Sequence, residues 1–243
     1  DYKVTGVQTC ALPILMGEAH RLIDSERLPI IEAVKDAAGE DLTVTVGVSA
    51  ESGRAVAERV KEAQLAGATA VMIAPAKLAK TNPQSTFSHY AAAQDVTQVP
   101  IVVQDLPEQT GVHMDPAFIA KLHSELPDAK YLKLEDPPTP QKVTRVKEAT
   151  NGSMGIFGGL GGAFLFEELR RGAVGTMTGF AYPEVLVAIH RYMSEGETER
   201  ARSIFYKWLP IIRYENSAGV SLAIRKEIRS EEHTSELQSP CNL

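Results

Sequence analysis

Two hydrophobic patterns alternate along most of the chain. Short runs rich in Val, Ile and Thr predict strands, at Thr43–Val48, Ala70–Ala74, Pro100–Gln104, Ala129–Leu134, Met154–Phe157 and Ala173–Thr178. Longer stretches with the period of an amphipathic helix cover Asp24–Ala38, Ser52–Ala66, Gln84–Thr97, Asp115–Glu125, Thr139–Ala149, Ala163–Arg171, Pro183–Glu195, Glu197–Leu209 and Glu215–Ile228. Strands that alternate with helices in this way predict βαβ units and a parallel sheet.

Several helix ends carry their own signals. Ser52 precedes a face rich in Ala and Val as an N-cap, and Asp115 followed by Pro116 combines a cap with a first-turn proline. Pro210 follows the stretch Glu197–Leu209, and we expect it to end that helix.

The strands have one apolar face and one polar face. In the run Ala129–Leu134 and the residue after it, Leu132 and Leu134 share one side, while Tyr131, Lys133 and Glu135 share the other. A doubly wound sheet covered by helices on both faces is expected to have nearly continuous apolar strands. The alternation therefore favours a (β/α)8 TIM barrel, in which polar residues at the carboxyl ends of the strands form the active site.

The strand count falls short of the eight that this barrel needs, because the pattern gives six, with Leu15–Met16 as the tail of another. Residues 1–14 resemble the translation of a common sequencing adapter in reverse complement, and residues 229–243 resemble the same adapter read forward. We expect both segments to be non-native and exclude them from the fold. Residues 15–228 are then an N-terminally truncated barrel with extra C-terminal helices, lacking the first strand, the first helix and most of the second strand.

Composition narrows the class of function. The formal net charge of -6 argues against nucleic acid as a partner, since phosphate binding needs a basic surface. No apolar run approaches the roughly 20 residues of a membrane-spanning helix, so we expect no membrane partner and a cytoplasmic location. Cys10 and Cys241 lie near opposite ends, which indicates neither a disulfide framework nor a metal site.

Lys133 is the first candidate for chemistry. A lysine amine at the end of a barrel strand becomes a nucleophile toward carbonyl carbon when its surroundings free it from its proton. Lys133 lies on the predicted lumen face between the apolar residues Leu132 and Leu134. The simpler interpretation is a lysine that extends out of the strand end or pairs with Glu135.

Five segments in series resemble the dihydrodipicolinate synthase / N-acetylneuraminate lyase family. They read GEAHRLIDSER, AGATAVMIAPA, PIVVQDLPEQTGV, KYLKLED and RRGAVGTMTGFAYPE, and begin at Gly17, Ala66, Pro100, Lys130 and Arg170. The resemblance implies a (β/α)8 barrel, commonly tetrameric, that binds pyruvate or another 2-oxo acid as a Schiff base on the lysine matched by Lys133. It implies no metal or organic cofactor, because the lysine amine activates the substrate, and it implies a homo-oligomer, a tetramer or a dimer.

The chain departs from the family pattern at three positions. Gln104 stands where the family has a proton-relaying tyrosine, and an amide is no acid or base near neutral pH. Gln109 replaces an arginine that binds a substrate carboxylate, and Met16 lies where paired threonines hold the carboxylate of the 2-oxo acid. The resemblance therefore implies a divergent member that does not synthesise dihydrodipicolinate itself.

Other polar and glycine residues complete the predicted pocket. Gly158–Gly162 forms a tight turn, a pocket wall that includes Gly159, or a phosphate site. Thr178 and Gly179 are expected to line the pocket, together with Met16, Gln104 and Gln109. The candidates to replace the tyrosine as acid or base are Glu18, His20, Asp105 and Glu135, although a structural role is the simpler interpretation of each. We expect Arg170–Arg171 and Arg225–Glu227 on solvated helix faces or in subunit contacts.

The sequence thus predicts a lyase in which Lys133 condenses with a 2-oxo acid for aldol cleavage, aldol condensation or dehydration. Two alternatives stay open. One is a phosphate-binding barrel isomerase or aldolase that uses Gly158–Gly162. The other is a barrel that only binds a small ligand.

Overall fold

The computed structural model describes residues 9–12, 22–39, 42–78 and 81–232. It contains one sheet of seven parallel strands in the order β1 to β7, in which each strand is hydrogen-bonded to the next along the chain. The strands are β1 Thr9–Leu12, β2 Thr43–Gly47, β3 Ala70–Ile73, β4 Ile101–Asp105, β5 Tyr131–Leu134, β6 Gly155–Gly158 and β7 Gly175–Thr176. The six strands that the pattern predicted are confirmed, with each end within two residues of the expected one.

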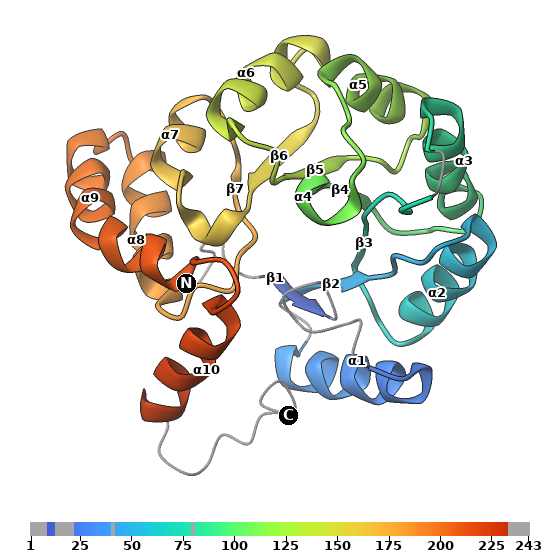
Figure 1. Ribbon diagram of the computed structural model, residues 1–243, viewed down its shortest axis with the longest axis horizontal. Helices are drawn as coiled ribbons and strands as arrows, with labels where there is room; N and C mark the ends of the chain where they lie inside the picture. The colour runs from blue at the N-terminus through green and yellow to red at the C-terminus, as the bar shows by residue number, and fades with distance from the viewer. Residues whose placement is uncertain (1–8, 13–21, 40–41, 79–80, 233–243) are drawn as a thin grey trace.

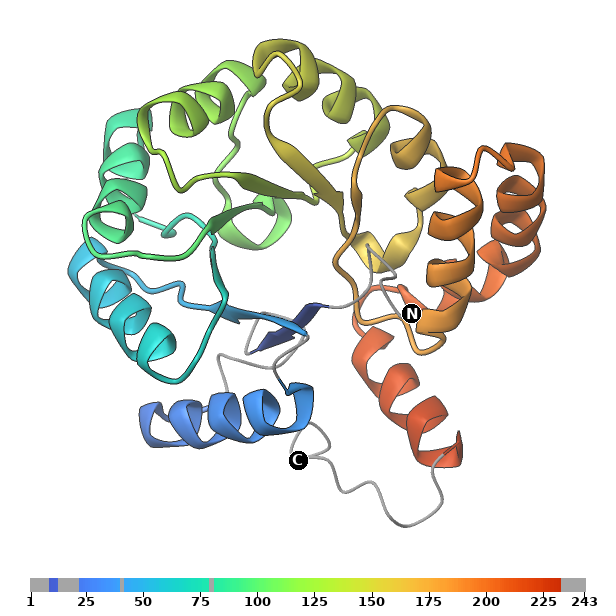
Figure 2. The same ribbon diagram turned by 180° about the vertical axis from the view of Figure 1, so that it is seen from behind.

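Helices surround the sheet on its outer side (Figures 1 and 2). They are α1 Asp24–Ala38, α2 Gly53–Leu65, α3 Pro83–Gln94, α4 Pro107–Thr110, α5 Pro116–Glu125, α6 Thr139–Ala149, α7 Leu165–Arg170, α8 Pro183–Ser194, α9 Thr198–Glu215 and α10 Ser221–Glu232, with a 3-10 turn η3 at Leu160–Gly162. The short helix α4 lies inside this ring, beside β4 (Figure 1). A parallel sheet curved inside a layer of helices confirms the α/β, barrel-type fold.

The predicted caps are present. The Ser52 hydroxyl accepts the backbone N–H of Ala55 at 3.2 Å, and the Asp115 carboxylate accepts that of Phe118 at 2.7 Å. Each bond satisfies one of the N–H groups that the first turn of a helix leaves without a partner.

The N-terminal prediction needs correction. β1 lies at Thr9–Leu12, within the segment that we excluded from the fold, and pairs with β2 in parallel register from Thr9 opposite Thr43. The expected strand tail Leu15–Met16 lies outside the described residues. At the other end, α10 continues to Glu232, four residues past the expected end of the domain at Ile228.

The prediction that Pro210 ends a helix is wrong, because α9 runs through it to Glu215. Leu209 and Ile212 lie on the buried side of α9, whereas Pro210 is exposed. Proline removes one helical hydrogen bond at this position. Continued burial of the apolar side, in a cluster shared with α7 and α8, offsets that loss.

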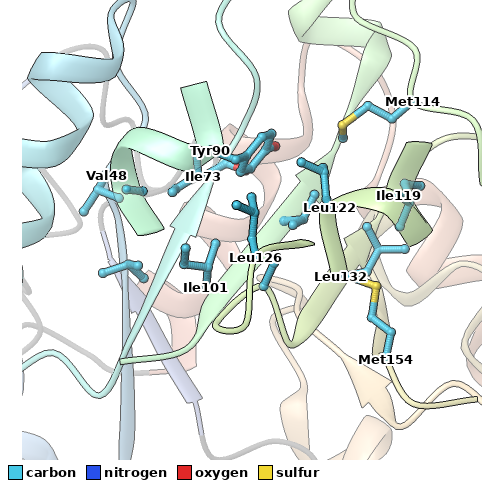
Figure 3. Packing of buried hydrophobic residues seen from close by; sticks show 14 of the residues in the cluster. Val48, Ile73, Tyr90, Ile101, Met114, Ile119, Leu122, Leu126, Leu132 and Met154 are labelled. Carbon is cyan, nitrogen blue, oxygen red and sulfur yellow. The ribbon is translucent and has the colours of Figure 1, made fainter. Parts of the chain in front are cut away.

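The two faces of the sheet bury different layers. On the outer face, aliphatic side chains such as Ile73, Ile101 and Leu132 pack against Tyr90 of α3 and Leu122 of α5 (Figure 3). Each such buried side chain contributes roughly 1.5–3 kcal/mol. The inner face carries a smaller apolar layer on neighbouring strands, made of Met72, Val102, Tyr131, Phe157 and Met177.

Candidate active site at the carboxyl ends of β4, β5 and β6

Lys133 lies on the inner face of β5, one step along the strand from the apolar layer that includes Tyr131. Its cross-strand partners are Gln104 on β4 and Phe157 on β6. Only 3% of Lys133 is exposed, so the side chain does not extend into solvent from the strand end. The strand alternation that the sequence predicted therefore places an amine in the interior of the barrel.

The partner of Lys133 is Glu135, two residues further along the chain. Lys133 Nζ lies 3.0 Å from Glu135 Oε2, and Gln104 Nε2 donates to the same oxygen at 2.8 Å. The backbone N–H of Leu160 lies 3.5 Å from Glu135 Oε1. Glu135 is buried, and the ammonium of Lys133 and two N–H donors balance its charge.

This arrangement brings an amine and a carboxylate into direct contact. A nucleophilic amine needs a neighbouring base to accept its proton, and Glu135 is within hydrogen-bond distance of Lys133. Gln104 cannot transfer protons, but its amide orients the carboxylate that can. The ion pair that we considered as the simpler interpretation of Lys133 is present, and the same contact places a carboxylate within proton-transfer distance of the amine.

Gly158 at the end of β6 and Gly159 directly after it make room for carboxylates. A β-carbon placed on Gly159 would lie 2.5 Å from Glu135 Oε1, and one on Gly158 would lie 1.8 Å from Glu168 Oε2. Neither space can hold a side chain. The two glycines therefore allow Glu135 on one side of the loop and Glu168 on the other to approach the backbone.

Glu168 is a buried carboxyl group of α7 that the sequence did not identify. Thr139 donates its hydroxyl to Glu168 Oε1 at 2.5 Å, while Glu168 Oε2 has no hydrogen-bond partner among the described residues. Burial raises the pKa of Glu168 to about 7, against the opposing effect of the Thr139 hydrogen bond.

Asp105 follows Gln104 on β4 and points away from the inner face. It is fully buried and pairs with Lys142 of α6, with 2.6 Å between Lys142 Nζ and Asp105 Oδ2. The same Nζ lies 2.7 Å from Asp136 Oδ2. Burial raises the pKa of Asp105 to about 6, and Lys142 opposes that rise. Asp105 is therefore part of a structural ion cluster and does not face Lys133.

A family model settles the ancestry of the chain. The family model described as "Dihydrodipicolinate synthetase family" matches residues 9–239 of the chain. The chain belongs to the dihydrodipicolinate synthetase family. The matched region includes β1 and continues past the end of α10.

Individual relatives carry two kinds of name. L-2-keto-3-deoxyarabonate dehydratase of Azospirillum brasilense is 29% identical over 203 residues, which are 82% of this chain and 65% of the relative. A 4-hydroxy-tetrahydrodipicolinate synthase of Synechococcus sp. is 28% identical over 201 residues, with 81% of this chain and 65% of the relative covered. The chain thus spans about two thirds of the length of these curated relatives.

Solved structures of the same family share the fold. A dihydrodipicolinate synthase from Rhodopseudomonas palustris is 32% identical with a TM-score of 0.84, covering 92% of this chain and 75% of that one. The dihydrodipicolinate synthase from Aquifex aeolicus has a TM-score of 0.87 at 18% identity, over 97% of this chain and 81% of that one. These likenesses confirm the resemblance that the five sequence segments indicated.

Gln109, Thr178 and Gly179 are less enclosed than Lys133. Gln109, at the family's arginine position, is exposed on α4. Thr178 is half-buried after β7, Gly179 is exposed beside Arg225, and Gly159 is buried against Glu135. Met16 lies outside the described residues, as do Glu18 and His20.

Arg225 corrects a further expectation. It is buried rather than solvated, because its guanidinium pairs with the fully buried Glu215 of α9. Glu215 also accepts the backbone N–H of Ala181, at 3.2 Å to each carboxylate oxygen. Arg170 and Arg171 are exposed, as expected. The buried pair connects α9 and α10 to the loop after β7.

Within the part of the chain that the structure places, no three His, Cys, Asp or Glu side chains gather in an arrangement suited to a metal ion. No helix there is both long enough and apolar enough to cross a bilayer.

Proposed function

We propose that this chain is a lyase domain in which Lys133 forms a Schiff base with pyruvate or another 2-oxo acid. The observation that carries the proposal is the buried group of Lys133, Glu135 and Gln104 at the carboxyl ends of β4 and β5. Membership of the dihydrodipicolinate synthetase family supports it, since the relatives of this chain include proteins named as synthases and as a dehydratase.

Glu135 supplies the proton transfers of Schiff-base formation. The Lys133 ammonium gives a proton to Glu135, and the free amine attacks C2 of the 2-oxo acid to form a carbon–nitrogen bond. A proton moves from nitrogen to the former carbonyl oxygen, which gives a carbinolamine. Glu135 then returns its proton to that hydroxyl, which leaves as water, and the product is a protonated imine on Lys133.

The same carboxylate continues the reaction. The imine withdraws electrons from C3, so Glu135 removes a C3 proton and an enamine forms. In a substrate with a hydroxyl group at C4, the enamine expels that hydroxyl, and the proton held by Glu135 leaves with it as water. Glu135 thus takes the place of the tyrosine that Gln104 replaces, and Gln104 holds it in position.

Dehydration fits the site better than dihydrodipicolinate synthesis. Gln109 is neutral and exposed on α4, so the bidentate arginine clamp for a second carboxylate is missing. A relative named as a dehydratase of a 2-keto-3-deoxy sugar acid points in the same direction. We infer a hydroxylated 2-oxo acid as substrate, with aldol cleavage or condensation as the other reactions available to the enamine.

The phosphate-binding alternative is not favoured. A phosphate after β6 would need N–H groups free of negative charge, but Glu135 and Glu168 are packed against Gly159 and Gly158. These carboxylates would repel a phosphate at that loop.

The test is borohydride reduction of the protein in the presence of pyruvate and a panel of hydroxylated 2-oxo acids, read by mass spectrometry. We expect a covalent adduct on Lys133 that is absent in Lys133→Ala and retained in Lys130→Ala, an exposed lysine three residues earlier. Deuterium uptake at the pyruvate methyl group, followed by NMR, reports the C3 proton transfer and is expected to stop in Glu135→Gln. A folded protein without any adduct would contradict the lyase proposal and leave a barrel that only binds ligand.

We also propose that residues 1–14 and 229–243 derive from a sequencing adapter, although β1 lies within the first of these segments. We infer further that the protein is a cytoplasmic homo-oligomer. Resequencing the gene from its source DNA tests the adapter origin, and sedimentation of the purified protein tests the oligomeric state.

A further inference from the structure

A single cation joins the strand ends that carry the site. Gln104 and Glu135 face Lys133, and the residue directly after each of them is an aspartate. Asp105 and Asp136 both contact Lys142 Nζ, at 2.6 Å and 2.7 Å. The two site residues on the inner face are therefore each one residue away from a carboxylate bound to the same ammonium group.

Among the described residues, Lys142 forms its ion pairs with these two aspartates. It lies in the first turns of α6, and its side chain is 10% exposed, while that of Asp105 is completely buried and that of Asp136 is 20% exposed. Asp105 Oδ1 accepts no hydrogen bond from the described residues, so Lys142 provides the compensation for this buried charge. Removing one partner of such a buried pair leaves an uncompensated charge, which is strongly unfavourable.

The backbone transmits the position of the cluster to the site. Successive side chains of a strand point to opposite faces, so fixing Asp105 on the outer face fixes Gln104 on the inner face. The N–H of Glu135 donates to the carbonyl of Asp105 at 2.8 Å, which continues the ladder between β4 and β5 past its last paired residues. The place at which Gln104 meets Glu135 thus depends on the segment that Lys142 holds.

We propose that Lys142 is a positioning residue for the reaction: by binding Asp105 and Asp136, it holds Gln104 and Glu135 at the distances from which Glu135 exchanges protons with Lys133 and substrate. This inference rests on the proposed function. Because a displacement of about 1 Å in a catalytic group costs up to about 100-fold in rate, loosening these strand ends slows proton transfer more than it weakens binding of the 2-oxo acid.

The experiment compares Lys142→Met with Lys147→Met. Lys147 lies later on α6 and, among the residues that the structure describes, donates to the Gly172 carbonyl at 3.4 Å, so it controls for the loss of a half-buried lysine from this helix. For Lys142→Met we expect deuterium exchange into pyruvate at saturation to fall about 10- to 100-fold. The pyruvate concentration for half-maximal exchange should change less than about threefold, and borohydride should still trap Lys133. Lys147→Met should stay near wild type, and Lys142→Arg should regain most of the lost rate because its guanidinium can bind two carboxylates.

The outcomes separate the inference from the function on which it rests. A wild-type protein that neither traps nor exchanges pyruvate overturns the proposed function, and the inference falls with it. A wild-type protein that does both, with Lys142→Met exchanging at an unchanged rate, overturns the inference alone. If Lys142→Met does not fold, the inference is tested with Asp136→Asn, which keeps the Asp105–Lys142 pair. That variant should exchange at least about fivefold more slowly, and an unchanged rate would refute the positioning role.

Discussion

Gly159 and Glu135 are so close that a β-carbon on Gly159 would lie 2.3 Å from Glu135 Cγ. Real β-carbons essentially never come within 3.0 Å of another heavy atom outside their chain neighbours. The missing side chain at position 159 is therefore a condition for the position of Glu135, and through Glu135 for its contact with Lys133.

Replacing Gly159 by alanine should consequently impair proton transfer. We expect Gly159→Ala to displace Glu135 and to slow deuterium exchange into pyruvate by at least about tenfold, on the scale of rate losses from misplaced catalytic groups. Gly155→Ala is the matched control, because its β-carbon would also collide, at 2.6 Å from a Tyr131 ring carbon, but in the apolar layer. Both variants should lose stability in urea. Equal exchange rates in the two would show that Glu135 is not the base.

Gln104 offers a second test of the same carboxylate. Its amide donates to Glu135 Oε2, and Gln104→Leu removes that donor with little change in side-chain volume. We expect unfolding free energy to fall by about 1 kcal/mol, the worth of one hydrogen bond, while exchange slows by about tenfold because Glu135 loses the group that orients it. Chemical denaturation and the exchange assay together separate the two effects, and loss of stability with an unchanged rate would assign Gln104 a structural role only.

The strand pattern of the sequence was sufficient to locate Lys133 and to put Glu135 beside it. Alternation along β5 assigns both side chains to one face, and parallel strands bring that face next to Gln104 on β4. The sequence left open whether Lys133 extends out of the strand end or pairs with Glu135. The three-dimensional arrangement decides for the ion pair with Glu135.

Residues that meet across helices could not be found in this way. Glu168 and Arg225 look like ordinary charged positions on amphipathic helices, yet both are buried, because their partners Thr139 and Glu215 come from other elements. The same limit explains the error at Pro210, where a local helix-ending signal is outweighed by packing of α9 against its neighbours. Local signals predict elements reliably only where tertiary contacts do not oppose them.

Glu168 should make stability depend on pH. Its pKa is raised from the ordinary 4.5 to about 7, so the folded state binds a proton that the unfolded chain has already released in this range. The contribution of Glu168 to the free energy of unfolding is fully present below about pH 4.5. It decreases by roughly 3 kcal/mol in total as the pH rises toward about 7. Glu168→Gln removes this titration. Urea denaturation at pH 5 and pH 8 should therefore show wild type losing more stability than the variant, and identical pH dependence would refute a raised pKa.

Arg225 should be worth far more to stability than an exposed arginine of the same region. Arg225→Met leaves Glu215 charged, fully buried and without its cation, which costs about 3–5 kcal/mol. Arg202→Met, which breaks an exposed pair with Glu199 on α9, should cost under about 1 kcal/mol. The double variant Arg225→Met with Glu215→Leu should recover most of the loss, because no unpaired charge remains buried. The measurement is the urea concentration at the midpoint of unfolding. If Arg225→Met and Arg202→Met have the same midpoint, the Arg225–Glu215 pair does not hold α10 against α9.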